Sequence, residues 1–309
     1  MRLGKSSVPL YFRIIRASLR RLNIYLTRRY EAAAIRSLAA TPALGEFAAA
    51  EQLLRGLDLP DDNSRAYFEK HLPRLARTLA LVPRAASSSR ILELGCYKQI
   101  TPFLHTWRGY REVRGAYKGP AGWTDHGTAS VRGQPFAVDI DHFDAERDRF
   151  PYEDAHFETV LACELIEHLL YDPMHLLLEA HRVLEEGGRL LITTPNAGSL
   201  ISVARALKGY ENPQVYALYT RPDPRSEPEI PHVREYTTFE LQTALESAGF
   251  EIETLFTEPI AEFARNLPLW DVLAAQGYDT SMRGEQTYCV AVKRANLPVT
   301  RYPYFLYSE

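Results

Sequence analysis

The spacing of hydrophobic residues changes at about residue 90 of this 309-residue chain. Before that point, apolar residues mostly recur every three or four positions, which is the spacing of amphipathic helices. After it, short apolar runs alternate with amphipathic stretches, a pattern typical of a parallel sheet with crossover helices. The pattern predicts three segments: an N-terminal helical extension over residues 1–85, an α/β domain over 86–296 and a C-terminal tail over 297–309.

Seven apolar runs predict the strands of a doubly wound, mostly parallel, seven-stranded sheet. In chain order these runs are residues 91–94, 112–116, 136–143, 157–163, 189–195, 250–256 and 287–293. Asp172 followed by Pro173 predicts the start of a helix that runs to Leu184. Thr237 and Glu240 have the spacing of a capping box and predict the start of another helix.

Two stretches interrupt the alternation of strands and helices. Residues 118–134 are rich in glycine and polar side chains, and they predict a hairpin-like insertion. Residues 197–235 hold several prolines and aromatic residues without a regular period. Long segments of this kind in compact domains are usually lids or binding loops, so we expect a lid insertion there.

The composition is ordinary for a soluble globular protein. The net charge of −3 argues against a nucleic-acid partner, because phosphate contacts need a basic surface. Three scattered cysteines, Cys96, Cys163 and Cys289, favour reduced thiols in a cytoplasmic protein over disulfides or a zinc site. No apolar run has the length needed to span a bilayer.

The N-terminal segment is basic and amphipathic. A stripe of apolar residues at helical spacing is flanked by arginines: the stripe is Ile15, Leu19, Leu22 and Leu26, and the flank is Arg13, Arg16, Arg20 and Arg21. Two interpretations are open. Residues 8–29 contact the anionic inner face of a membrane peripherally or an acidic partner, or the stripe packs on its own domain.

Polar residues follow several of the predicted strands. Glu93, Asp144, Glu164 and Asn196 all fall at or just beyond strand ends. In a doubly wound sheet, ligands bind outside the carboxyl ends of the strands. The sequence therefore predicts a binding site at this edge of the sheet.

Four segments in order resemble class I S-adenosylmethionine-dependent methyltransferases, which have a Rossmann-like fold. They are "ILELGCY", "FPYEDAHFETVLACELIEHL", "HRVLEEGGRLLITTPN" and "HVREYTTFELQTALESAGFEIE". The resemblance implies S-adenosylmethionine as cofactor, bound by four residues: Glu93, Gly95, Asp144 and Cys163.

The cofactor pattern is incomplete in two places. Tyr97 and Gln99 stand where the family commonly has further glycines. Tyr117 stands where the second strand of the family usually ends in an acid that binds both ribose hydroxyls. These departures keep open a non-catalytic, methyltransferase-like binding or scaffold protein.

A second resemblance concerns a metal. The spacing of Glu164, Glu167 and His168 predicts that all three lie on one face of a helix. This Glu-x-x-Glu-His arrangement, with His232 followed by "VREYT", resembles metal-dependent O-methyltransferases. The resemblance implies a site for Mg²⁺, Mn²⁺, Co²⁺ or Zn²⁺ held by Glu164, Glu167, His168 and His232. Two alternatives are open: His168 or His232 acts as a base without metal, or the cluster is inert.

The leading hypothesis is methyl transfer from S-adenosylmethionine to a hydroxyl of a sugar, glycan precursor or other polyol-bearing metabolite. His168 and His232 are the candidate catalytic residues. An alternative is a 2′-O-methyltransferase of the terminal ribose of small RNAs, against which the acidic balance argues.

Overall fold

The computed structural model describes residues 44–86, 88–209, 211–215, 231–260, 268–277, 280–303 and 305–307. The amphipathic segment at residues 8–29 lies outside these described residues, as do residues 210 and 216–230 of the expected lid. Within the described part, no helix is both long and apolar enough to cross a membrane.

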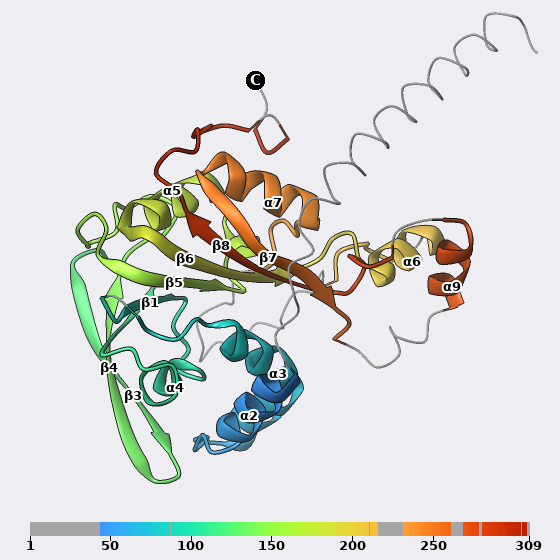
Figure 1. Ribbon diagram of the computed structural model, residues 1–309. Coiled ribbons are helices and arrows are strands. Elements are labelled where there is room, and N and C mark those ends of the chain that lie inside the picture. The colour runs from blue at the N-terminus through green and yellow to red at the C-terminus, as the bar shows by residue number, and fades with distance from the viewer. Residues whose placement is uncertain are drawn as a thin grey trace, which may run out of the picture. The chain divides into compact units, whose positions relative to one another are not determined.

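The described strands form one eight-stranded sheet with the order β3-β4-β2-β1-β5-β6-β8-β7 (Figure 1). The strands are β1 Arg90–Leu94, β2 Glu112–Tyr117, β3 Trp123–Val131, β4 Gln134–His142, β5 Phe157–Cys163, β6 Leu184–Pro195, β7 Phe250–Glu258 and β8 Gln286–Lys293. The β4, β2, β1, β5 and β6 strands are parallel, whereas β3 and β8 run antiparallel to their neighbours. The predicted doubly wound, mostly parallel α/β fold is confirmed.

Helices cover both faces of the sheet (Figure 1). They are α2 Leu44–Leu54, α3 Asp62–Leu81, α4 Thr101–Thr106, α5 Pro173–Val183, α6 Leu200–Lys208, α7 Thr238–Ser247 and α9 Pro268–Ala275. One hydrophobic core joins the sheet to α5 and α7, and another joins it to α2, α3 and α4. This two-sided burial explains why most residues of β5 are apolar. The α2 and α3 helices, placed by the sequence pattern in the N-terminal extension, thus pack directly on the sheet.

The eighth strand comes from the predicted hairpin-like insertion. β3 pairs antiparallel with β4 over its full length, and the turn between them is formed by Arg132 and Gly133. Both turn residues have positive φ, at 50° and 74°, as two-residue hairpin turns that match strand twist require. β3 is mostly polar and exposed, so it lacked the apolar signal that identified the other seven strands.

One predicted helix limit is wrong by one residue, and the predicted capping box is confirmed. The α5 helix begins after its N-cap Asp172, as predicted, but it ends at Val183, and Leu184 already pairs with Phe157 in the sheet. The capping box of Thr237 and Glu240 is present at the start of α7.

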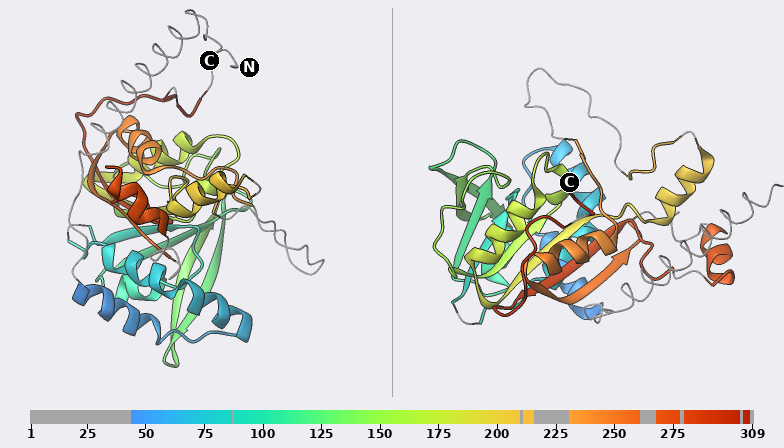
Figure 2. Two further views of the ribbon diagram at one scale, coloured as in Figure 1. Left: turned by 90° about the vertical axis from the view of Figure 1, so that its right-hand side faces the viewer. Right: turned by 90° about the horizontal axis from the view of Figure 1, so that it is seen from above.

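The α6 and α9 helices pack on each other (Figure 2). The C-terminal residues also contact the domain, since Arg301 donates to the carboxylate of Asp172.

Candidate functional site

The order of the strands marks where a ligand would bind. From β1 the chain proceeds to β2 and β4 on one side, and then crosses to β5 on the other side of β1. The strand order therefore reverses between β1 and β5. In open α/β sheets, ligands bind in the crevice at such a switch point, beyond the carboxyl ends of the strands.

The turn after β1 leaves room beside the backbone. Gly95 has φ +69°, and a Cβ added there would find its nearest atom, Cδ1 of Leu165, 4.0 Å away. Lys98 also has positive φ, at 67°, so the turn keeps a glycine-like backbone without a second glycine. The Gly95 turn is thus open and left-handed.

Glu93 supports this turn from inside. Its side chain is buried, and the hydroxyl of Thr101 donates to it at 2.6 Å. Burial raises the pKa of Glu93 to about 7, although hydrogen bonds from Thr101 and Cys96 oppose that rise. Thr101 is the first residue of α4, whose N-cap is Ile100, and its hydroxyl bonds Glu93 and not the helix backbone.

The predicted cofactor residue Asp144 lies just after β4. Nζ of Lys118, which follows β2, is 3.4 Å from its Oδ2, and its Oδ1 accepts from the backbone N–H of Glu146. Cys163 ends β5, and burial raises its pKa. Glu93, Gly95, Asp144 and Cys163 therefore lie at the ends of β1, β4 and β5, and their binding of the cofactor remains a prediction.

Glu164 does not share a helical face with Glu167 and His168. Glu164 has φ +51°, outside the helical region, and only residues Ile166–His168 form a single turn of 3₁₀-helix. The prediction that all three residues lie on one face of a helix is wrong, because the left-handed backbone at Glu164 is not part of a helix.

The side chain of Glu164 consequently turns toward other elements. Its Oε1 accepts from the hydroxyl of Thr193 and from the amide of Gln286, each at 2.7 Å. Its Oε2 is 3.3 Å from Nη1 of Arg74 in α3. Nothing in the sequence singled out Arg74 or Gln286, because each is distant from Glu164 along the chain.

Glu167 is fully buried, with no exposed surface. Its Oε2 accepts from the hydroxyl of Thr194 at 2.9 Å, whereas its Oε1 has no hydrogen-bond partner among the described residues. Burial, and then the nearby charge of Glu164, raises the pKa of Glu167 well above its ordinary range. A buried carboxylate oxygen without a donor is costly, and a cation would satisfy it.

Two histidines lie next to Glu167. The rings of His168 and His232 meet edge to face, with centroids 4.7 Å apart. Glu167, His168 and His232 each present one ligand atom within 4.8 Å of the others. The structure thus brings together three of the four predicted metal residues, and Glu164 is not part of this group.

The segment after residue 231 is held against the 3₁₀ turn by its backbone. The N–H groups of Val233 and Arg234 donate to the carbonyl of Glu167, at 2.8 and 3.2 Å. This pairing places His232 beside Glu167, although the two are far apart in sequence.

Oxygen acceptors orient both imidazoles. Nδ1 of His168 is 3.3 Å from the carbonyl of Pro231, and Nδ1 of His232 is 3.3 Å from the carboxylate of Glu235. A neutral imidazole that donates from Nδ1 carries its lone pair on Nε2, which is how metal-binding histidines are commonly fixed. Glu235 belongs to the motif that follows His232, but its contact with His232 could not be predicted from the sequence.

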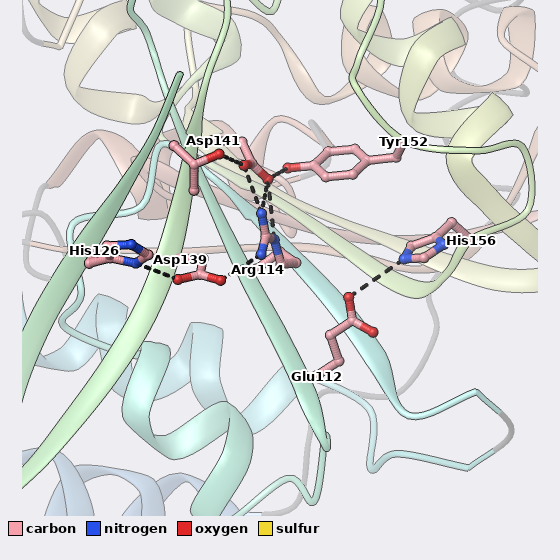
Figure 3. Close-up of polar contacts among 8 residues, drawn as sticks. Glu112, Arg114, His126, Asp139, Asp141, Tyr152 and His156 are labelled. Atoms are coloured by element: carbon pink, nitrogen blue, oxygen red, sulfur yellow. Dashed lines mark hydrogen bonds and ion pairs between the residues drawn. The ribbon is translucent and has the colours of Figure 1, made fainter. Parts of the chain in front are cut away.

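A separate polar cluster lies on β2, β3 and β4 (Figure 3). Arg114 donates to Asp139 and to Asp141, and Asp141 also accepts from Thr124 and Tyr152. The cluster borders a cavity of about 360 Å³. Residues 143–156, which connect β4 to β5 and are all described, contain no helix. Because the hydrogen bonds of Asp141 are satisfied within the cluster, we interpret it as structural.

Known proteins resemble this chain over much of its length. The sequence profile of the methyltransferase domain family matches residues 65–255, more than half of the chain. A protein of Mycolicibacterium smegmatis, described as a probable S-adenosylmethionine-dependent methyltransferase, is 33% identical over 126 residues. That match spans 40% of this chain and 40% of the length of the relative.

Solved structures are similar at lower identity. An S-adenosylmethionine-dependent methyltransferase from Thermotoga maritima is 17% identical with a TM-score of 0.44, over 80% of this chain and 100% of that one. One from Mesorhizobium loti is 16% identical with a TM-score of 0.43, over 72% and 98%. A chain from the complex between the Haloferax volcanii Trm112 methyltransferase activator and a methyltransferase is 15% identical with a TM-score of 0.44. The similarity covers 79% of this chain and 97% of that one.

Proposed function

This chain belongs to the methyltransferase domain family, and we propose that it is an enzyme that methylates a hydroxyl of a sugar, glycan precursor or other polyol-bearing metabolite. Its domain is of the S-adenosylmethionine-dependent type. The cofactor supplies an electrophilic methyl group on a sulfonium centre. We propose that it is held by four residues at the ends of β1, β4 and β5: Glu93, Gly95, Asp144 and Cys163.

The observation that carries the choice of an alcohol acceptor is the cluster of Glu167, His168 and His232 at the end of β5. An alcohol loses its proton too reluctantly at neutral pH to be a good nucleophile. A group that withdraws or accepts that proton is therefore needed next to the methyl donor. Two imidazoles with lone pairs on Nε2, beside a buried carboxylate, provide this function.

The same three residues fit a divalent metal. The Oε1 atom of Glu167 lacks a donor among the described residues, and Glu235 and Pro231 orient the two imidazoles as metal ligands are commonly oriented. A bound divalent cation would supply Lewis acidity, which lowers the pKa of an oxygen next to it. Two nitrogens and one carboxylate suit Zn²⁺, Co²⁺ or Mn²⁺ better than Mg²⁺, which prefers oxygen ligands.

We extend the proposal to the location of the protein. The basic, amphipathic segment at residues 8–29 would place a cytoplasmic enzyme peripherally on the inner face of a membrane, where lipid-linked glycan precursors are available. This part of the proposal rests on the sequence alone, because the segment lies outside the described residues.

The test is a methyl-transfer assay on the full chain with S-adenosylmethionine and a panel of sugars and polyols. Reactions run in a chelator alone and in the chelator with excess Zn²⁺, Co²⁺, Mn²⁺ or Mg²⁺. We expect transfer to a hydroxyl that the chelator abolishes and a metal restores. Transfer that the chelator leaves unchanged would assign the histidines as metal-free bases and reject the metal.

A binding measurement separates the enzyme from a scaffold. Calorimetric titration with S-adenosylhomocysteine, the product of the cofactor, should show a single site per chain. No binding at millimolar concentration would reject the enzymatic proposal. Methylation of a small RNA in place of every polyol tested would reject the proposed acceptor class.

A further inference from the structure

The two tyrosines that depart from the cofactor pattern of the family are in contact with each other. Tyr97 follows Gly95 where another glycine is common, and Tyr117 ends β2 where an acid is common. Their hydroxyl oxygens are 3.4 Å apart, and their rings meet edge to face with centroids 5.6 Å apart. Because these two tyrosines are in contact, one shared function explains them better than two separate losses of cofactor-binding residues.

Both phenols lie at the ligand-binding edge of the sheet. The β1 and β2 strands are parallel neighbours, and the N–H of Cys96 continues their pairing by donating to the carbonyl of Ala116. This pairing sets the open Gly95 turn beside Tyr117. The exposed fractions are 62% for Tyr97 and 40% for Tyr117, so neither ring serves the core.

The position of the pair suggests what it binds. In related folds that bind nucleotide cofactors, an acid about 20 residues after the glycine turn accepts hydrogen bonds from the ribose. Tyr117 occupies that position but carries a phenol. Each phenol both accepts and donates a hydrogen bond, so two phenols in contact can satisfy the two neighbouring hydroxyls of a ribose.

The surrounding charges are compatible with an uncharged pair. Asp144, which is also predicted to bind the cofactor, already pairs with Lys118. We infer that Tyr97 and Tyr117 together hold the ribose diol of the cofactor in place of the missing carboxylate. The inference rests on the proposed function, because it requires S-adenosylmethionine at this edge.

The test uses phenylalanine variants of the full chain, which keep each ring and remove only its hydroxyl. Affinity for S-adenosylhomocysteine is measured by calorimetry for Tyr97→Phe, Tyr117→Phe and the double variant. Each single variant should bind about fivefold to tenfold more weakly, the effect of one lost hydrogen bond. The double variant should lose less than the product of the two factors, because the phenols act as a unit.

Tyr302→Phe is the matched control. Tyr302 is as exposed as Tyr97, at 62%, and lies in the C-terminal segment, so its variant should bind like the wild type. The family-like variant with Tyr97→Gly and Tyr117→Glu restores a carboxylate, and it should recover wild-type affinity. Thermal melting of each variant confirms that the protein is folded.

Ribose analogues test the same contact from the ligand side. The 2′-deoxy and 3′-deoxy forms of S-adenosylhomocysteine should bind the wild type about fivefold to tenfold more weakly, and the phenylalanine variants should add no further loss. Deoxy analogues that bind as tightly as the parent would overturn the inference. So would phenylalanine variants that bind normally while Tyr117→Ala does not, since that result assigns stacking to the rings. A wild type that binds no S-adenosylhomocysteine would reject the proposed function itself.

Discussion

Nη1 of Arg74 lies 3.3 Å from Oε2 of Glu164, and this ion pair joins α3 to the carboxyl end of β5. Both side chains are largely buried, with 11% and 21% of their surface exposed. The neighbouring Arg77 makes a second such pair with Glu258 at the end of β7. Two ion pairs therefore hold the α3 helix at the edge of the sheet where the candidate site lies.

We predict that Arg74→Met lowers the free energy of unfolding by about 2 kcal/mol, because it leaves a largely buried carboxylate without its cation. Urea denaturation at pH 7 measures the change. Adding Glu164→Gln to this variant removes the stranded charge and should recover part of the loss. Equal stability of the single and double variants would show that the charge of Glu164 is not the cause.

Glu164→Gln and Glu167→Gln form a matched pair for the metal. Only Glu167 lies with His168 and His232, so Glu167→Gln should reduce affinity for Zn²⁺ or Co²⁺ at least tenfold, and Glu164→Gln should leave it near the wild-type value. Glu235→Leu should weaken metal binding about 10- to 100-fold, because it removes the acceptor that orients His232.

Competition titration with a chromophoric chelator, together with the metal content of purified protein, measures these affinities. An equal loss in Glu164→Gln and Glu167→Gln would restore the four-residue site expected from the sequence. Wild-type affinity in all three variants would reject a metal at this cluster.

Local patterns predicted most of the fold. The β5 strand was predicted at its observed limits, because a strand buried on both faces is rich in apolar residues. The starts of α5 and α7 follow from Asp172 and Thr237, whose side chains accept from the first turn of each helix. These signals are local, and the eighth strand was missed because β3 carries few apolar residues.

The candidate site was only partly predictable, for a physical reason. Helical spacing places Glu164 with Glu167 only if the chain between them is helical, and φ of +51° at Glu164 breaks that condition. The direction of its side chain is set by Arg74 and Gln286, which reach it through the tertiary fold. His232 was identified by its motif, and its contact with His168 depends on backbone pairing that no sequence spacing reports.

Asp141 should make the protein less stable in acid. Burial alone would raise the pKa of Asp141, but hydrogen bonds from Arg114, Thr124 and Tyr152 outweigh burial and lower it. A carboxyl group with a lowered pKa adds stability above its ordinary pKa of about 4, and that stability disappears as the pH falls through the folded value. The difference in unfolding free energy between wild type and Asp141→Asn should therefore be largest near pH 7 and shrink below about pH 4.

Asp139→Asn is the control for the acid series, since Asp139 contacts the same Arg114 from a more exposed position. Its effect at pH 7 should be smaller than that of Asp141→Asn. If the two variants lose equal stability at every pH, the hydrogen bonds of Asp141 are not the source of the acid sensitivity.

Glu93 should have the opposite dependence on pH. Burial raises its pKa to about 7, so the folded chain holds a proton that the unfolded chain releases above about pH 4.5. The folded state is then favoured at low pH, and stability falls as the pH rises from about 4.5 to about 7. When complete, this loss of stability is about 3 kcal/mol, the free energy that corresponds to the shift in pKa.

Glu93→Gln keeps an acceptor for the hydroxyl of Thr101 but cannot ionise. We therefore expect this variant to be more stable than the wild type at pH 8 and about equally stable at pH 5, in urea denaturation at both values. A constant difference between the two proteins from pH 5 to pH 8 would show that Glu93 is ionised in the folded protein throughout this range.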